Sequence, residues 1–134
     1  MKKFVLLYVC MFLMIPVFAQ TNFQDLSLVQ ALEQAKSGKK LVFVDCYTSW
    51  CGPCKIMAKE ILPQKEVGDF LNERFVCVKY DMEKGEGPEI AKKYEVDAYP
   101  TFLLLNADGC LINSIVGITS TEGEFIYKVK LALG

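Results

Sequence analysis

The spacing of apolar residues along the first half of the chain predicts a helix followed by a strand. From residue 26 to residue 35 apolar positions recur at helical spacing, and Ser37-Gly38 then ends the helix. The recurring positions are Leu26, Val29, Leu32 and Ala35. The run from Leu41 to Tyr47 is almost continuously apolar, which is typical of a strand covered on both faces.

The rest of the pattern alternates in the same way. It predicts a helix at 51–62 ended by Pro63, a helix at 66–72, a strand at 75–80, a helix from Pro88 to about 94, strands at 101–105 and 110–116, and a helix at 121–133. Helical crossovers favour parallel pairing, whereas the turn at 106–109 predicts an antiparallel hairpin. We therefore expect one α/β domain with a mixed sheet between helices.

The N-terminus has the pattern of a secretory signal peptide. Lys2 and Lys3 precede an apolar run over residues 4–15, and small residues at Val17 and Ala19 suit a cleavage site. The run is shorter than the about 20 residues that a membrane span needs. We expect cleavage after Ala19, so that residues 1–19 are a signal peptide and residues 20–134 form the exported domain. A retained N-terminal anchor and, less favoured because bulky residues precede Cys10, a lipoprotein modified at that cysteine are the alternatives.

The charge balance excludes some partners and chemistries. The chain has 15 basic and 16 acidic residues, and removing residues 1–19 takes away two lysines and no acid. No basic patch is present, so we do not expect nucleic acid as a partner. The chain has no histidine, which excludes histidine-based acid–base catalysis and histidine metal ligands.

The cysteines form one close pair and several single residues. Of the six, Cys10 lies in the signal peptide, and an odd number in the exported part argues against a simple disulfide framework. We expect Cys46, Cys77 and Cys110, which lie in apolar runs, to be core residues.

The remaining pair, Cys51 and Cys54, lies between the end of a predicted strand and the start of a predicted helix. A helix N-terminus favours thiolate over thiol, and thiolate is the species that attacks disulfides. The spacing therefore indicates thiol–disulfide exchange. A structural disulfide and half of a zinc site are the alternatives, although zinc normally takes four ligands and such a small ring constrains little chain entropy.

From about Phe23 to Leu133 the chain resembles the thioredoxin superfamily. Three features carry the resemblance: the run Trp50-Cys51-Gly52-Pro53-Cys54, Asp45 six residues before the first cysteine, and Tyr99-Pro100-Thr101 before the third strand. The resemblance implies the thioredoxin fold, an α/β architecture with a central mixed β-sheet flanked by helices on both faces.

Two positions depart from that family. Its members often carry a lysine on the second strand near the buried acid, and we expect Cys77 at the matching position here. The kink-forming proline of thioredoxin is replaced by Lys59, and the helix break moves to Pro63. This stretch is more similar to exported reductases, such as the C-terminal domain of the transmembrane thiol-reductant conduit.

The resemblance also implies roles for the cysteine pair and for Asp45. Cys51 is expected to be the exposed nucleophilic sulfur, and Cys54 the thiol that resolves the mixed disulfide. Burial should raise the pKa of the Asp45 carboxyl, which suits a base that takes the Cys54 proton. A carboxylate held by local hydrogen bonds is the alternative for Asp45.

Five further residues are expected to face the substrate. Pro100 is expected in the cis form, where its segment pairs with the substrate backbone, and the bulky Tyr99 limits which substrates approach. Trp50 is expected beside the sulfur, and the Gly52-Pro53 spacer goes with reducing behaviour in the family.

Together these features predict a dithiol reductase of protein disulfides that works as a monomer in a periplasmic or other extracytoplasmic compartment. It needs no cofactor and no metal, but an oxidising environment implies a membrane thiol-reductant donor. The alternatives are a disulfide oxidase or isomerase with the same residues, and a non-catalytic thioredoxin-like binding module.

Overall fold

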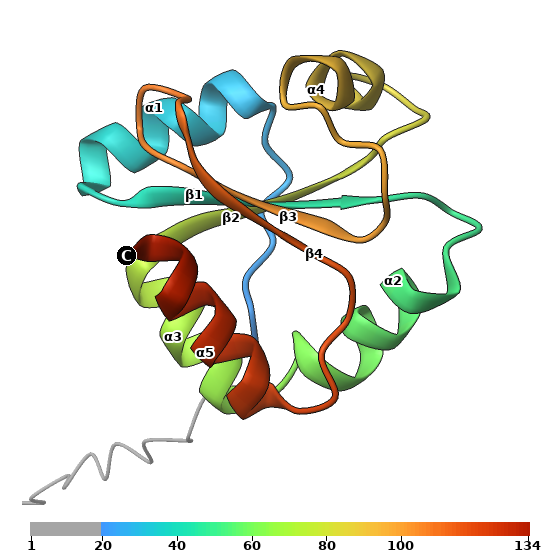
Figure 1. The fold of residues 1–134 in the computed structure, drawn as a ribbon. Coiled ribbons are helices and arrows are strands. Elements are labelled where there is room, and N and C mark those ends of the chain that lie inside the picture. The colour runs from blue at the N-terminus through green and yellow to red at the C-terminus, as the bar shows by residue number, and fades with distance from the viewer. Residues whose placement is uncertain (1–19) are drawn as a thin grey trace, which may run out of the picture.

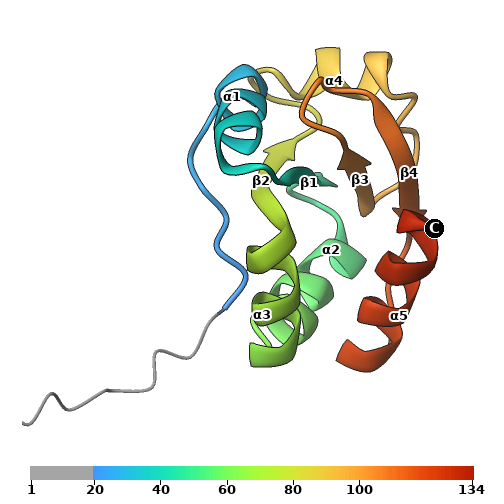
Figure 2. The same ribbon diagram turned by 90° about the vertical axis from the view of Figure 1, so that its left-hand side faces the viewer.

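A four-stranded β-sheet separates two layers of helices in the computed structural model, which describes residues 20–134 (Figures 1 and 2). The strands are β1 (Leu41–Tyr47), β2 (Phe75–Asp81), β3 (Thr101–Leu105) and β4 (Leu111–Val116), in the order β2-β1-β3-β4. The predicted signal peptide lies outside the described residues. None of the helices within residues 20–134 has the length and apolar character to span a bilayer.

Helices cover both faces of the sheet, as expected. One face carries α1 (Leu28–Gly38) and α4 (Gly87–Lys93) (Figure 2). The other face carries α2 (Gly52–Ile56), the π-helical turn η1 (Met57–Ile61), α3 (Lys65–Arg74) and α5 (Glu122–Leu133). The sequence predicts one helix over 51–62; the structure divides it into an α-helical and a π-helical part, and the helix ends before Pro63.

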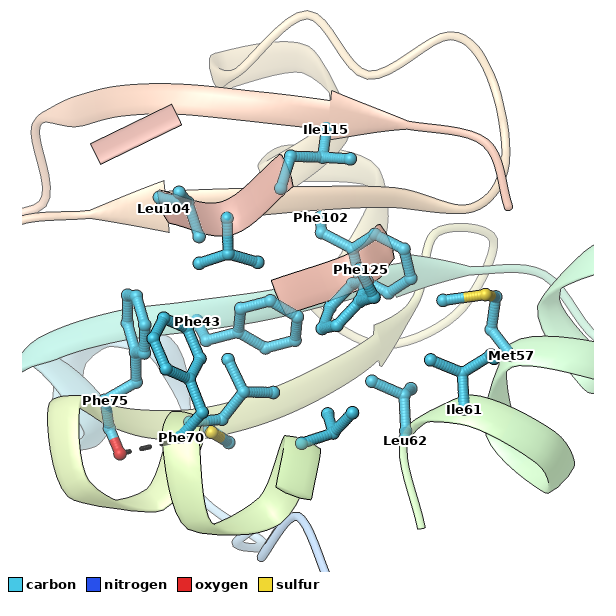
Figure 3. Close-up of a cluster of buried hydrophobic side chains, with 14 residues drawn as sticks. Phe43, Met57, Ile61, Leu62, Phe70, Phe75, Phe102, Leu104, Ile115 and Phe125 are labelled. Atoms are coloured by element: carbon cyan, nitrogen blue, oxygen red, sulfur yellow. Dashed lines mark hydrogen bonds between the residues drawn. The ribbon is translucent and has the colours of Figure 1, made fainter. Parts of the chain in front are cut away.

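The two layers enclose two hydrophobic clusters because side chains alternate along β1. Val42, Val44 and Cys46 face α1 and α4. Phe43 faces the other layer and lies at the centre of an aromatic cluster (Figure 3). Its ring centroid is 5.5 Å from that of Phe102, and four other aromatic contacts link the cluster's rings.

One strand runs against the expected direction. β1 and β2 are parallel, but β3 is antiparallel to β1, with Cys46 opposite Thr101. Residues 82–100, which include α4, connect β2 to β3 without carrying the chain back along the sheet. The chain therefore enters β3 at the same end of the sheet at which it leaves β2. The β3–β4 pair is the predicted antiparallel hairpin.

The first helix starts later than its apolar spacing suggests. Ser27 caps α1 through a capping box with Gln30, so the buried face consists of Leu28, Ala31 and Ala35. Val29, one of the recurring apolar positions, is 65% exposed. As the residue next to Leu28, it points about 100° away from that buried side chain around the helix axis.

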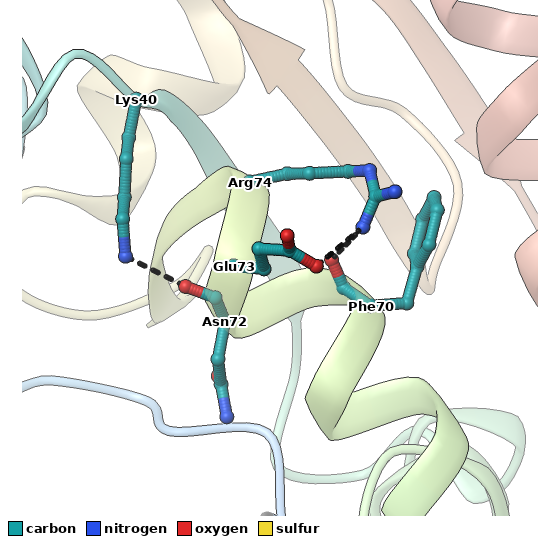
Figure 4. A network of polar contacts seen from close by, with 5 residues as sticks. All are labelled: Lys40, Phe70, Asn72, Glu73 and Arg74. Carbon is teal, nitrogen blue, oxygen red and sulfur yellow. Dashed lines mark hydrogen bonds and ion pairs between the residues drawn. The ribbon is translucent and has the colours of Figure 1, made fainter.

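Polar contacts at the end of α3 hold neighbouring segments in place. The Lys40 ammonium donates to the Asn72 carbonyl at 2.7 Å, and Arg74 donates to the Phe70 carbonyl while its guanidinium covers the Phe70 ring (Figure 4). The Asn72 side chain donates to the Gln20 carbonyl and accepts from the Asn22 N–H, at 2.7 and 2.8 Å. These bonds fix the first described residues beside the sheet.

Candidate active site

The cysteine pair lies where β1 leads through a short loop into α2. Cys51 is the N-cap of α2, and the Cys51 sulfur accepts a hydrogen bond from the Cys54 N–H at 3.1 Å. The two residues form a disulfide, with Gly52 and Pro53 in the first helical turn. When this disulfide is reduced, the N–H groups at the helix start stabilise a thiolate at Cys51.

Exposure does not distinguish the two cysteines in the disulfide form. Cys51 is 4% exposed and Cys54 is 7% exposed, so the expectation of an exposed Cys51 sulfur is wrong for this state. The Cys51 sulfur is bonded to the Cys54 sulfur and accepts a hydrogen bond from the Cys54 amide. Gly52 and Pro53 are exposed beside it.

Asp45 and Cys54 line the same cleft, which has a volume of about 520 Å³. Asp45 is 6% exposed, and within the described residues its Oδ1 has no hydrogen-bond partner. Burial raises the pKa of the Asp45 carboxyl from 3.8 to about 7, against the opposing effect of Lys79. A carboxyl group with a pKa near neutrality can exchange a proton with a thiol. Among residues 20–134, the Oδ1 of this carboxyl therefore lacks the local hydrogen bond that the alternative for Asp45 requires.

The lysine expected to be missing is present as Lys79. In the register of β1 and β2, Asp45 lies opposite Lys79, whereas Cys77 lies opposite Phe43. The prediction that Cys77 takes the lysine's place is therefore wrong. Which residue of β2 lies beside Asp45 depends on how β1 and β2 pair, and the spacing along the chain does not give this pairing. Lys79 also lines the Asp45 cleft.

Trp50, which directly precedes Cys51, contacts an aromatic side chain from a separate segment. The Tyr99–Pro100 peptide bond is cis, as the resemblance implies. The Tyr99 ring meets the Trp50 ring edge-on, with centroids 5.9 Å apart, and Trp50 is 65% exposed. The Trp50 indole N–H donates to the Glu83 carboxylate at 2.7 Å. No sequence motif marks Glu83 as a site residue, because its contact with Trp50 spans 33 positions.

The single cysteines divide into two kinds. Cys46 and Cys77 are buried, as expected, and burial raises the pKa of the Cys77 thiol to about 12. Cys110 is exposed, so its prediction as a core residue is wrong. It precedes β4, an edge strand of which only Ile115 is buried. Within residues 20–134, no group of three or more cysteine or acidic side chains could hold a metal ion.

The fold and the Cys51–Cys54 disulfide can now be compared with known protein families. A family model of the thioredoxin-like domain matches residues 28–131. The chain belongs to the thioredoxin-like family, and with its Cys51–Cys54 disulfide it is a thiol–disulfide oxidoreductase.

Individual relatives agree with this class. Mitochondrial thioredoxin-3 of Saccharomyces cerevisiae is 44% identical over 89 residues, which are 66% of this chain and 64% of that protein. The chain thus spans just under two thirds of the yeast protein's length.

Two solved structures have the same fold over most of their length. A proposed disulphide-isomerase from Bacteroides thetaiotaomicron is 45% identical, with a TM-score of 0.77 over 86% of this chain and 94% of that one. The C-terminal domain of DsbD from Neisseria meningitidis, in its oxidised form, is 25% identical, with a TM-score of 0.66 over 84% of this chain and 98% of that one.

Proposed function

We propose that this protein is a dithiol reductase of protein disulfides in an extracytoplasmic compartment. The observation that carries the proposal is the cysteine pair at the start of α2, with a Gly-Pro spacer and with Asp45 in the cleft that Cys54 lines. The spacer favours the reducing direction by its resemblance to thioredoxin, whose potential is near −270 mV, against about −120 mV for the oxidant DsbA.

The first step uses the Cys51 thiolate. It attacks one sulfur of a substrate disulfide, forms a Cys51–substrate bond and breaks the substrate S–S bond. The electron pair of the broken bond leaves on the other substrate sulfur, which takes up a proton from water.

The second step uses Cys54 and Asp45. The Cys54 thiol gives its proton to the Asp45 carboxylate, and the resulting thiolate attacks the Cys51 sulfur. The Cys51–Cys54 bond forms, and the second substrate sulfur leaves as a thiolate. The substrate is thereby reduced to a dithiol, and the enzyme is oxidised to the disulfide that the structure contains.

Substrate recognition is assigned to the surface around the disulfide. The Trp50 ring and the Tyr99 ring form one side of that surface, and the exposed Gly52-Pro53 turn lies next to it. Tyr99, in the cis-proline segment just before β3, presents backbone groups that pair with an extended substrate segment. The edge-on Trp50–Tyr99 contact favours flexible substrate loops over rigid ones, because bulky aromatic side chains restrict the approach.

Export and electron supply complete the proposal. Residues 1–19 direct export and are cleaved after Ala19, and the protein acts as a monomer. An oxidising compartment keeps converting the dithiol to the disulfide, so a membrane-embedded thiol donor must reduce it again. The similarity to a domain of DsbD supports a place in such an extracytoplasmic electron-transfer chain.

Cysteine variants test the catalytic roles directly. We expect Cys51→Ser to abolish insulin disulfide reduction, and Cys54→Ser to accumulate mixed disulfides that are visible on non-reducing gels. Cys110→Ser, which removes an exposed cysteine outside the pair, is the matched control and should keep full activity. Full activity of Cys51→Ser would overturn the assignment.

An isomerase or oxidase is the second candidate, favoured by the name of the Bacteroides relative. The equilibrium potential of the Cys51–Cys54 pair in graded glutathione buffers separates the two. A potential near about −270 mV supports the reductase, and one near about −120 mV supports a disulfide donor.

A further inference from the structure

Lys79 lies between two clefts with different chemistry. One is the cleft of Asp45 and Cys54, and the other is an open cleft whose acidic lining residues are Asp25, Asp81 and Glu86. The side chain is exposed, and within residues 20–134 it forms no ion pair within 4.0 Å. Its long stem therefore gives the ammonium two competing environments, of which the second carries more negative charge.

The Phe23 ring lies against that ammonium on the Asp45 side. The Lys79 nitrogen is 5.4 Å from the ring centroid, within the range of a cation–π contact, and Phe23 lines the Asp45 cleft together with Lys79. Phe23 does not line the acidic cleft.

The position of Phe23 is well defined by its neighbours. Its backbone forms a parallel bridge with Cys77, and the next residue, Gln24, donates its N–H to the Cys77 carbonyl at 2.9 Å. The Phe23 ring also packs against Phe43, with centroids 6.4 Å apart. The ring is thus a fixed surface beside a flexible lysine.

We propose that Phe23 is a positioning residue that holds the Lys79 ammonium in the Asp45 cleft and so controls the proton transfer from Cys54 to Asp45. The inference rests on the base role given to Asp45 in the proposed function. Phe23 acts through Lys79 and has no direct role in the chemistry.

Other charged and titratable groups around Asp45 come from three elements. They are Tyr47 on β1, Lys79 on β2, and Cys54 and Lys55 on α2. Cys46 lies on the opposite face of the sheet, and the first described residues, 20–23, contribute no charged side chain. Phe23 can therefore influence Asp45 electrostatically only by placing one of these groups, and Lys79 is the one that it contacts.

The test measures the titration midpoint of Asp45 by carboxyl carbon NMR in the oxidised protein, with Phe23→Leu made in two backgrounds. With Lys79 present, we expect Phe23→Leu to raise the midpoint by about half a pH unit, about a threefold change in acidity, because the cation moves away. In the Lys79→Met background the same substitution should leave the midpoint unchanged. Phe23→Tyr keeps the ring and should keep the original midpoint.

A matched control removes a ring from another cation. Phe70 lies under the Arg74 guanidinium at 4.2 Å on α3, so Phe70→Leu loses a similar contact but should not shift the Asp45 midpoint. An equal shift in both Lys79 backgrounds would show that Phe23 acts by excluding water, and no shift in either would show no influence. Both outcomes overturn the inference.

A separate measurement distinguishes failure of the Asp45 base role from failure of the Phe23 positioning role. The rate at which Cys54 resolves the Cys51 mixed disulfide should have a pH inflection that Asp45→Asn removes. If Asp45→Asn leaves the inflection in place, the base role in the proposed function fails. If Asp45→Asn removes it and Phe23→Leu does not move it, only the role of Phe23 fails.

Discussion

Asp45 is the residue at which burial most directly affects the chemistry. A carboxyl group that is 6% exposed with an unpartnered oxygen is poorly solvated when it is ionised, so its neutral form is favoured. Lys79 opposes this effect but does not cancel it, and the pKa of Asp45 stays near 7. Burial suits Asp45 to receive a proton, and for the same reason the ionised form of Asp45 lowers the stability of the fold.

Stability should therefore fall as the pH rises. The pKa of Asp45 is about 7 in the fold and near 3.8 in the unfolded chain, so the native state binds the proton more tightly. The stabilisation is complete below about pH 4 and is lost as the pH rises through 7, by up to about 4 kcal/mol. Urea unfolding of the oxidised protein at pH 4 and pH 8 measures this loss.

Asp45→Asn supplies the comparison, because its amide does not ionise. Its free energy of unfolding should change much less between the two pH values. The variant should therefore be more stable relative to the parent protein at pH 8 than at pH 4. An identical pH dependence in both proteins would contradict the buried-carboxyl explanation.

At the scale of elements, the start of α4 depends on one glycine. A Cβ at Gly87 would overlap the Asp81 carbonyl group at the end of β2, with its carbon only 2.7 Å away and the Met82 Cα at 2.8 Å. These neighbours are backbone atoms, which cannot rotate away as a side chain can. The close approach of helix and strand at this point therefore requires glycine.

We expect Gly87→Ala to destabilise the protein by about 3 kcal/mol, since the backbone of α4 or β2 must shift to relieve the overlap. Urea denaturation measures the change. Gly123→Ala in α5 is the control: within residues 20–134, nothing beyond its chain neighbours and its own helix backbone lies within 4 Å of an added Cβ. Alanine's better helix propensity should stabilise the protein by about 0.5 kcal/mol. A similar loss in both variants would contradict the steric explanation.

At the scale of the whole molecule, the aromatic cluster joins the sheet to the layer formed by α3 and α5. Phe43 on β1 contacts rings from β2, β3 and α5 (Figure 3). It also contacts the Phe23 ring of the N-terminal segment. These segments are far apart in the chain, so their packing stabilises the fold as a unit rather than any single element. The cysteine pair sits at the end of the strand that carries this residue.

We expect Phe43→Ala to lower the free energy of unfolding by about 3–5 kcal/mol, because it removes a fully buried ring and leaves a cavity. Val29→Ala, at an exposed position on α1, should change it by less than about 0.5 kcal/mol. Thermal or urea unfolding compares the two. A loss under 1.5 kcal/mol for Phe43→Ala would mean that the surrounding rings collapse into the space.

Local patterns were sufficient for most elements and for the reactive pair. The predicted strand at 101–105 has the bounds of β3, and Thr121 is the N-cap of α5, because caps and apolar runs act over a few residues. The Cys51–Cys54 disulfide needs only a short spacing and the helix start that follows it. The cis bond at Pro100 followed from the resemblance and not from local physics.

Features that depend on strand register and on contacts between distant residues could not be predicted from the sequence alone. Lys79 rather than Cys77 lies opposite Asp45, because side-chain neighbours across a sheet follow from the pairing of β1 and β2. The antiparallel direction of β3 depends on how residues 82–100 pack against the sheet, and the exposure of Cys110 depends on the edge position of β4. The sequence determined the elements and the redox pair, whereas tertiary packing determined which charges and rings surround that pair, since burial and distance exist only once the sheet is assembled.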